Sequence, residues 1–569
     1  MEKLDKLGKV YTTDVLILGG GLAGMSAAHG AKNSGQDVLV ADRCYFGYTG
    51  QSTRAGHGLC FMKPEDKIEN LMYYAITMNK DGLWLNDQDV LLSTSQEQYT
   101  YLQEMEKYGA IFSHEEDGSI HGHKEYPQKP TSSTNVDLDL ITGITNEARR
   151  RGIRLLERVY FTDLLKDNET GRVIGAVGFD MDTLETVIMK AKAVINASNA
   201  FNFCPGGMFM MGADAQVAAY NAGAQFRNAE QCTYIDLNYR NTKEYIYGMH
   251  MFLVNAEGEN ISQKYAPNEL EEVSIELVEG MIEEVKAGRG PIYLDYSQMP
   301  PGLKDGFYQG QLMPKRLGVY GWLHLKNGEP GEKPEVSVDL KVLSQALRVD
   351  KDIRTNLEGL WAPGNISMYG CAYGGWIHGD GVGWAMRSGL HAGKDAGKYA
   401  AEHEHGTVDI AQVEAMKERV YKPLERKSGI LPNELLDEFG MLILQPKYTI
   451  KKTEETIQEC LNKLDKLMEK FQNEVYVPEG DGHYLGKANE VWADIIMMRI
   501  IFAACLARKE TRGAAIRADY PKRDDKNWLK WVIVEKGADG NPEAHYERIP
   551  FERYPIKPEG WTPEEIPIE

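Results

Sequence analysis

Two short apolar runs near the N-terminus enclose a glycine turn that few folds accommodate. Residues 13–18 have the sequence TDVLIL, and Gly19, Gly21 and Gly24 follow with the spacing GxGxxG. A stretch with helical spacing comes next, and the run DVLVAD then ends at Asp42. A strand, a glycine turn, a helix, a second strand and an acid in this order are typical of a βαβ unit that binds a dinucleotide.

Each part of this pattern has a physical role in such a unit. Gly19 permits the tight turn, Gly21 lets the backbone approach a pyrophosphate, and Gly24 lets helix and strand pack closely. The free N–H groups and the dipole at the start of the helix attract phosphate, and Asp42 can accept hydrogen bonds from ribose hydroxyls. The alternative interpretation is a glycine-rich turn in an ordinary βαβ unit.

Length and composition set limits on the rest of the chain. A chain of 569 residues is too long for one core and indicates two to four domains. A formal net charge of −20 argues against nucleic acid and anionic membranes as partners. No apolar run reaches the length of a membrane span, and the polar start lacks a signal-peptide core, so we expect a cytoplasmic protein without membrane insertion.

The seven cysteines are scattered along the chain, and none forms a CxxC pair. We therefore expect free thiols, and neither a structural metal nor an iron–sulfur cluster held by this chain.

The pattern of apolar residues predicts an α/β fold in several parts. We expect a Rossmann-like domain over 1–227 and 351–401, an inserted α+β capping domain over 228–350, and a helical C-terminal domain over 402–569 that ends in an irregular tail. Alternating residues over 153–195 predict a hairpin whose turn is supplied by Asn168 and the residues up to Gly171.

Segments spread over nearly the whole chain carry a family pattern: VLILGGGLAG, STRAGHGLC, KAVINAS, MGADAQVAAYNAGA, GRGPIYLD, EGLWAPGN and RKETRGAAIRADYP. With them the chain resembles the flavoprotein subunits of succinate dehydrogenase, fumarate reductase and, most closely, the alpha subunit of adenylylsulfate reductase. The resemblance implies a Rossmann-like FAD domain, a mobile capping domain and a helical C-terminal domain, with catalysis between the FAD domain and the cap.

The same resemblance assigns contacts to FAD. It implies that Gly19, Gly21, Gly24 and Asp42 hold the ADP half, that Ser52, Thr53 and Gly58 run along the flavin and pyrophosphate, and that Phe161 meets the adenine. Ala197 and Ser198 match an ATG-like loop, Asp214 a TGDG-like loop, and Gly364 with Asn365 the pair that binds the ribityl chain. Leu22, Ala23 and Arg43 complete the set of expected cofactor-binding residues.

Two departures from the family pattern bear on chemistry. Several family members bond FAD covalently through a histidine, and Thr53 stands in its place here, which implies non-covalent FAD. Fumarate reductases use an arginine to deliver a proton to substrate carbon, and Ser274 falls at that position. Serine cannot replace the charged donor, which argues against succinate or fumarate, although another donor could serve a related substrate.

Four residues are candidates for catalysis. By loose alignment Arg240 and His324 match substrate-contacting residues of the family, with a surface salt bridge and a structural histidine as the alternatives. His378, flanked by glycines, could hydrogen-bond the flavin or donate a proton, and His57 lies in the flavin-adjacent segment.

Two classes of function remain open from the sequence. In the first, the chain is an enzyme that transfers hydride or electrons between flavin N5 and a small anionic substrate, with a separate ferredoxin-like iron–sulfur partner in a homo- or hetero-oligomer. Its versions are an adenylylsulfate reductase and an enoate C=C reductase or dehydrogenase. In the second, the chain is a non-catalytic flavin relay, a role that needs no substrate chamber.

Overall fold

The computed structural model describes residues 4–48, 50–53, 58–78, 84–122, 130–136, 139–198, 200–203, 211–240, 250–267, 274–298, 333–368 and 380–560. The chain divides into two compact units. The larger unit comprises Met1–Asn202, Met211–Cys232 and Leu343–Glu569, and the smaller unit comprises Phe203–Met210 and Thr233–Val342. The expected domain boundaries, including 228–350 for a capping domain, stay predictions.

The larger unit contains a five-stranded parallel sheet in the order β17–β10–β2–β3–β6. Its strands are β2 (Val15–Leu18), β3 (Val38–Ala41), β6 (Arg154–Leu156), β10 (Ala193–Asn196) and β17 (Leu360–Trp361). Four of them, β2, β3, β10 and β17, are buried along their whole length, which explains why their sequences lack the alternation of a half-exposed strand. The pairing of β2 with β3, joined by α1 (Leu22–Lys32), forms the βαβ unit.

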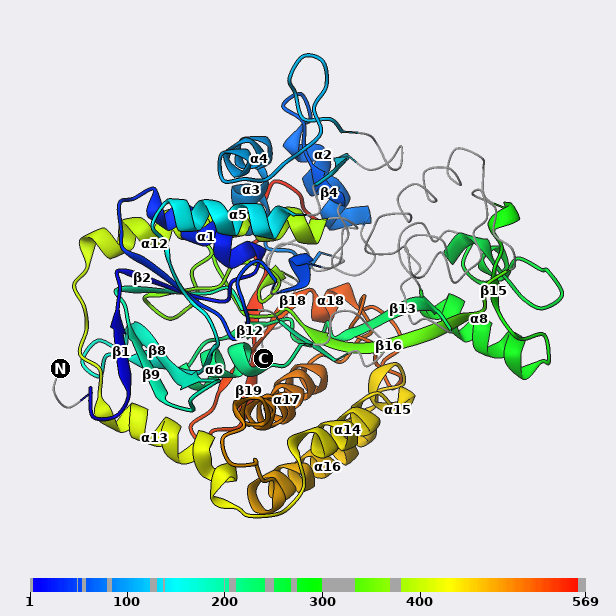
Figure 1. Cartoon of the computed structure of the whole chain (residues 1–569). Coiled ribbons are helices and arrows are strands. Elements are labelled where there is room, and N and C mark those ends of the chain that lie inside the picture. The colour runs from blue at the N-terminus through cyan, green and yellow to red at the C-terminus, as the bar shows by residue number, and fades with distance from the viewer. Residues whose placement is uncertain are drawn as a thin grey trace. The chain divides into compact units, whose positions relative to one another are not determined.

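Two helices that carry glycines pack closely beside each other, α1 and α12 (Asp380–Glu402), as Figure 1 shows. A Cβ atom on Gly389 would overlap the carbonyl oxygen of Ala23, and one on Gly393 would overlap that of Ala27. Side chains at either position would push the helices apart. These glycines therefore hold α12 against the helix that follows the glycine turn.

A second sheet of the larger unit has the order β1–β9–β8–β7, with β1 (Lys9–Thr12), β7 (Val159–Lys166), β8 (Val173–Asp180) and β9 (Thr186–Lys190). The expected hairpin is formed by β7 and β8. Its turn contains the expected residues Asn168 to Gly171, and Asp167 Oδ1 supports it by accepting the backbone N–H groups of Glu169 and Thr170, both at 3.1 Å. The Asn168 side chain donates to Asp409 at 2.6 Å.

Shorter elements complete the first part of the larger unit. They are β4 (Gly58–Phe61) paired with β5 (Ser132–Asn135), the helices α2 (Ile68–Tyr73), α3 (Gln88–Ser95), α4 (Gln98–Lys107), α5 (Leu140–Arg150) and α6 (Asp214–Ala222), the strands β11 (Phe201–Phe203) and β12 (Phe226–Arg227), and single turns at Gln51–Thr53 and Tyr74–Met78. Buried His29 on α1 connects two of these helices, since its ring stacks on Tyr108 and its Nε2 lies 3.1 Å from the Ile144 carbonyl oxygen.

Helices dominate the larger unit after residue 402. They are α13 (Ile410–Tyr421), α14 (Pro432–Ile443), α15 (Pro446–Thr449), α16 (Glu454–Glu474), α17 (Gly482–Ala507) and α18 (Asp525–Trp528), with a 3-10 turn at Lys422–Glu425. α14 and α16 pack against α17, which is buried along most of its length (Figure 1). Among the described residues, no helix has the length and apolar character required to cross a membrane.

The segment expected to be an irregular tail contains an antiparallel hairpin, β18 (Lys530–Lys536) and β19 (Pro542–Arg548). A buried guanidinium anchors it, because Arg508 donates to the carbonyl oxygens of Trp528 and Lys530, each at 2.9 Å, and to Glu230 at 2.5 Å. Within the RKETRGAAIRADYP segment, Glu510 accepts from both Arg508 and Arg512. The charged side chains of this segment therefore form buried ion pairs, and these attach the hairpin to the rest of the larger unit.

Backbone hydrogen bonds join the points where the chain leaves the larger unit and returns to it. Asn202 and Met211 exchange a pair of backbone hydrogen bonds of 3.0 and 2.9 Å. The Leu343 N–H donates to the Cys232 carbonyl oxygen at 3.0 Å. Each segment of the smaller unit therefore leaves the larger unit and returns to it at neighbouring residues.

The smaller unit has its own core. The antiparallel pair β13 (Thr233–Tyr239) and β16 (Val336–Ser344) packs with β14 (Leu253–Val254), β15 (Tyr293–Leu294), α7 (Ile261–Tyr265) and α8 (Ile275–Lys286), and 3-10 turns lie at His250–Phe252 and Tyr296–Gln298. Its buried side chains include Leu237, Phe252, Leu277, Met281 and Val336. Because of these contacts, the smaller unit is compact in its own right.

A single carboxylate ties the parts of the smaller unit together. Buried Glu284 on α8 accepts from Asn255 at 2.9 Å, Lys264 at 3.0 Å and Tyr265 at 2.7 Å, and from Arg289 through two guanidinium nitrogens at 2.6 and 2.9 Å. The Arg289 guanidinium is the main reason why the pKa of Glu284 is lowered well below its usual value. The charge therefore stays on this carboxylate under ordinary conditions.

Candidate functional site

The glycine turn has the geometry that the sequence pattern predicts. Gly19 has a φ of +104°, which favours glycine, and its N–H donates to the Ala41 carbonyl oxygen at 2.8 Å. A Cβ atom on Gly24 would overlap the carbonyl oxygen of Gly19. At Gly21 no described atom lies within 4 Å of a Cβ position, so the backbone there borders open space that a phosphate group fits.

Asp42 braces this turn. Its Oδ2 accepts the Gly20 N–H at 2.6 Å and its Oδ1 accepts the Cys44 N–H at 2.7 Å, and the residue is buried. A carboxylate has about four acceptor positions, so these two bonds are compatible with an added ribose contact. The sequence predicted the ribose contact and missed the support of the turn.

The small-residue segment after β3 folds over the glycine turn. Ser52 Oγ accepts the Leu22 N–H at 3.2 Å, at the start of α1. A Cβ atom on Gly50 would lie 3.3 Å from the Gly21 Cα. Thr53 Oγ1 donates to the Gly50 carbonyl oxygen at 2.9 Å. Ser52 and Thr53 therefore lie beside the turn as expected, and Gly58 begins β4.

The loop after β10 closes another side of the turn. The Ala197 N–H donates to the Leu18 carbonyl oxygen at 2.9 Å, and Ser198 Oγ donates to the same oxygen at 3.1 Å. A Cβ atom on Gly19 would lie 2.8 Å from the Ala197 carbonyl oxygen. The structure thus brings the ATG-like loop against the first glycine of the turn.

Gly364 and Asn365 reach the same place from a distant part of the sequence. Gly364 has a φ of +83°, and a Cβ atom there would lie 2.7 Å from the Ala23 Cβ. Asn365 Nδ2 donates to Gln51 Oε1 at 2.7 Å. Asn365 Oδ1 is buried and has no hydrogen-bond partner among the described residues. A ribityl hydroxyl is the donor that such a buried acceptor fits.

Phe161 and Asp214 lie on neighbouring elements. β7 is an edge strand, and its register shifts between Phe161 and Asp163, which leaves one residue out of the ladder. The Val159 N–H donates to the Asp42 carbonyl oxygen at 3.0 Å, so this strand runs beside the end of β3. Burial raises the pKa of Asp214, and Arg43 opposes that shift.

The structure therefore collects all sixteen expected cofactor-binding residues in the larger unit: Gly19, Gly21, Leu22, Ala23, Gly24, Asp42, Arg43, Ser52, Thr53, Gly58, Phe161, Ala197, Ser198, Asp214, Gly364 and Asn365. Sequence reasoning missed Gln51, the partner of Asn365, and two acids on α17, Glu490 and Asp494, which lie beside Arg43 and the loop before α6. The sequence carried no clear signal for the two acids, because α17 also contains Lys487 and Arg499.

The candidates for catalysis are less well defined. His57, His324 and His378 lie outside the described residues. Arg240 is exposed in the smaller unit and forms an ion pair with Glu335. This is the surface salt bridge that was the alternative to a substrate contact. Ser274 is the N-cap of α8, and its Oγ accepts the Leu277 N–H at 3.2 Å. The side chain at the family's proton-donor position therefore has a structural task here.

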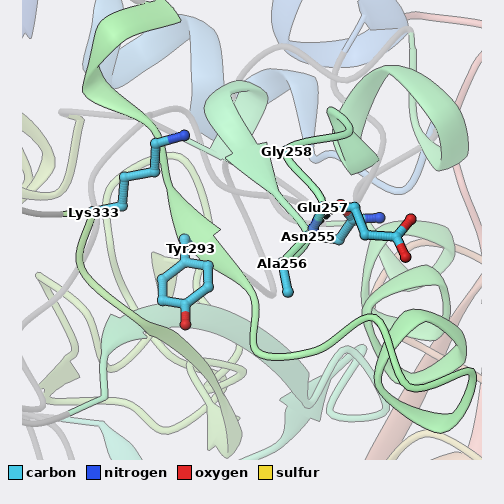
Figure 2. A pocket seen from close by; sticks show the side chains of 6 residues that line it. All are labelled: Asn255, Ala256, Glu257, Gly258, Tyr293 and Lys333. Carbon is cyan, nitrogen blue, oxygen red and sulfur yellow. Dashed lines mark hydrogen bonds between the residues drawn. The ribbon is translucent and has the colours of Figure 1, made fainter.

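The smaller unit also contains a cavity of about 320 Å³, lined by Asn255, Ala256, Glu257, Gly258, Tyr293 and Lys333 (Figure 2). Two of its polar groups are already engaged, because Lys333 forms an ion pair with Asp295 at 2.7 Å and Asn255 donates to Glu284. We assign no ligand to this cavity.

A parallel sheet whose first turn, second-strand acid and later glycine loop meet at one place defines a dinucleotide-binding protein of the Rossmann-like class. A family model described as an FAD binding domain matches residues 14–383, and one described as the fumarate reductase flavoprotein C-term matches residues 441–562. The chain therefore belongs to the family of FAD-binding flavoprotein subunits of fumarate reductase and succinate dehydrogenase.

Relatives match along nearly their whole length. The chain is 26% identical to a fumarate reductase (CoM/CoB) subunit of Methanothermobacter marburgensis, over 93% of this chain and 98% of the relative. It is 23% identical to the fumarate reductase flavoprotein subunit of Haemophilus influenzae, over 95% of each chain.

Solved structures share the fold. Adenylylsulfate reductase of Archaeoglobus fulgidus superposes with a TM-score of 0.79 at 19% identity, over 96% of this chain and 97% of that chain. A mutant of the E. coli quinol fumarate reductase superposes with a TM-score of 0.77 at 20% identity, over 95% and 97%. The comparisons confirm the predicted family, the fold class, FAD as cofactor and an oxidoreductase activity.

Proposed function

We propose that this chain is the flavoprotein subunit of an enzyme that exchanges electrons between a small anionic substrate and a separate iron–sulfur protein. The observation that carries the proposal is the match, over nearly the whole chain, to a fumarate reductase subunit of similar length. It favours an unsaturated carboxylate, reduced at its C=C bond, or the saturated acid, oxidised in reverse, as the first substrate class to test.

The cofactor half of the proposal rests on described residues. When bound, FAD supplies two-electron redox chemistry at its ring. The open backbone at Gly21 and the start of α1 would hold the pyrophosphate, and buried Asn365 Oδ1 would accept from the ribityl chain. These contacts fix the flavin from its nucleotide end.

The substrate half rests on the sequence. Arg240 and His324 are proposed to bind the anion, and His378 and His57 to donate a proton or a hydrogen bond at the flavin. For Arg240 this requires the guanidinium to exchange Glu335 for the substrate. His378→Ala is expected to slow turnover severalfold while FAD stays bound, and unchanged turnover would remove His378 from the list.

A sulfur oxyanion, as in adenylylsulfate reductase, is the second candidate for the substrate. The observation in its favour is Ser274, which caps α8 and cannot act as the charged donor of fumarate reductases. The proposal of a separate iron–sulfur partner rests on the family and on the scattered cysteines of the sequence.

One spectroscopic experiment separates these functions. The purified holoprotein is titrated with sulfite, and in a parallel sample the reduced protein is mixed with small unsaturated carboxylates. Reoxidation by an unsaturated acid without bleaching by sulfite supports the C=C chemistry. Bleaching of the main visible flavin band by sulfite supports the sulfur oxyanion. If no small molecule perturbs the flavin, the chain acts as an electron relay and the proposal is wrong.

A further inference from the structure

Acidic side chains of the C-terminal helix α17 reach the nucleotide end of the FAD site. α6 and α17 lie side by side in the larger unit (Figure 1). Glu490 and Asp494, one turn apart on α17, are 4% and 1% exposed. They face the loop that leads into α6 and the residue that follows Asp42, so a helix far along the sequence borders two segments that are expected to bind FAD.

Glu490 lies between this loop and Arg43. Its Oε2 is 3.6 Å from Arg43 Nη1, and its two oxygens accept from Lys487 at 3.0 and 3.1 Å. A Cβ atom on Gly212 would overlap the Glu490 Cγ, so only glycine leaves room for this side chain against the loop. The carboxylate therefore touches the loop backbone and attracts the guanidinium.

Asp494 accepts a hydrogen bond from the same loop, at the residue next to α6. Its Oδ1 accepts the N–H of Ala213, the residue that precedes α6, at 2.8 Å. Burial and the neighbouring Glu490 raise the pKa of Asp494 well above its usual value, with Asp214 also raising it and Lys487 opposing. A protonated Asp494 can anchor the loop without adding a third negative charge beside Glu490 and Asp214.

Arg43 is placed to act on the nucleotide. It directly follows Asp42, the acid at the end of β3, and its side chain remains 35% exposed. Its guanidinium lies 5.7 Å from the centre of the Tyr160 ring, on the edge strand that carries Phe161. Although burial alone would lower its pKa, the nearby Asp214, Tyr160 and Glu490 raise it above the usual value, so Arg43 is a fixed positive charge.

From this arrangement we infer that α17 belongs to the FAD-binding apparatus: Glu490 positions Arg43 against the adenosine half of FAD, and Asp494 positions the loop before α6. Neither acid needs to touch FAD. Both are positioning residues, and their effect is confined to the half of FAD that FMN lacks.

The test compares binding constants of two flavins. Full-length protein stripped of its cofactor is titrated with FAD and with FMN, and the variants are Glu490→Gln, which removes the charge beside Arg43, and Asp494→Leu, which removes the acceptor of the Ala213 N–H. Loss of a charged partner, or of a buried hydrogen-bond acceptor, weakens binding by about tenfold or more. We expect the FAD dissociation constant of each variant to rise by about this factor, with FMN affinity unchanged and weaker competition by ADP.

Two controls make the result decisive. Asp465→Asn removes the surface partner of Arg499, another charged residue of α17, and should leave FAD affinity unchanged. In an Arg43→Gln background, Glu490→Gln should cause no further loss of FAD affinity, because Glu490 acts through Arg43. An equal loss of FAD and FMN affinity, or additive losses in the double variant, would overturn the inference and leave the acids a purely structural role.

Discussion

At the scale of single residues, the site depends on groups that satisfy backbone atoms as much as on groups that face the cofactor. The Asp42 carboxylate accepts hydrogen bonds from the backbone N–H groups of Gly20 and Cys44. The Ser52 hydroxyl accepts one from the backbone N–H of Leu22. Removing such a side chain would release the turn as well as a proposed contact to FAD. Asn365 differs, since its buried oxygen has no partner among the described residues and fits a ligand donor.

A prediction about attachment of the cofactor belongs to Thr53. Its hydroxyl donates to the Gly50 carbonyl oxygen, and it offers no imidazole that could bond to a flavin carbon. We expect FAD to be held without a covalent bond. After acid precipitation of the purified protein, the yellow colour should stay in the supernatant. Yellow colour in the washed pellet would show that another residue forms the bond.

The geometry of the glycine turn could be predicted from the sequence because it belongs to a short motif with a backbone requirement, whereas the contacts of the sixteen residues to FAD stay predictions. Gly19 and Gly364 have positive φ, which glycine supplies. Gln51, Glu490 and Asp494 could not be predicted in this way. Their roles depend on contacts between segments far apart in the chain, and no local pattern records such contacts.

At the scale of elements, buried polar groups decide how helices and strands are joined. The sequence predicted the βαβ unit and the β7–β8 hairpin, since periodicity and turn residues are local signals. It missed β18 and β19, although the apolar run Trp531 to Val534 is typical of a buried strand. The strongly charged residues before this hairpin suggested an irregular tail, whereas Arg508 and Glu510 are fully buried in an ion network.

Glu284 gives a prediction for the smaller unit. Glu284→Gln removes a buried charge that accepts from Lys264, Arg289 and two further side chains, and leaves these donors poorly satisfied. We expect much faster hydrogen exchange of backbone amides over 253–294 and a midpoint of unfolding for this unit lower by roughly 5 °C or more.

The matched control is Glu259→Gln, a half-exposed acid that shares Lys264 with Glu284. Its loss should change exchange only slightly. Because the folded-state pKa of Glu284 is lowered, its contribution is present above the pKa of the unfolded chain and is lost as pH falls through the folded value. Similar exchange in both variants would show that Glu284 does not tie the unit together.

At the scale of the whole molecule, the larger unit is closed by contacts between its first and last parts. Asp87 at the start of α3 forms an ion pair with Arg227 at 2.8 Å and accepts from the Tyr554 hydroxyl at 3.0 Å. Trp531 donates to the Leu85 carbonyl oxygen at 2.8 Å. Trp531 and Tyr554, late in the chain, are therefore part of the core, which the sequence alone did not indicate.

The pH dependence of stability follows from buried His29. Burial, partly opposed by a hydrogen bond to the Ile144 carbonyl oxygen, lowers the pKa of His29 to about 4 from its usual 6.5. Between these two pKa values His29 is protonated in the unfolded chain and neutral in the folded chain. The free energy of unfolding therefore falls as pH decreases from about 6.5 towards 4. The loss is at most about 3 kcal/mol.

Urea unfolding midpoints measured from neutral pH down to about pH 5 test this expectation. His29→Gln should flatten the decline, whereas His545→Gln, which replaces an exposed histidine, should leave it as in the unchanged protein. A decline that persists in His29→Gln would assign the acid sensitivity to other groups.

The paired backbone crossings at Asn202 with Met211 and at Cys232 with Leu343 have an evolutionary consequence. A segment that departs and comes back at adjoining points can be lengthened, shortened or exchanged during descent without altering the path of the flanking strands. Residues 233–342 could then change during evolution to accept new substrates, while the residues proposed to bind the nucleotide stayed the same. One ancestral flavin scaffold could thus diversify into enzymes of different specificity.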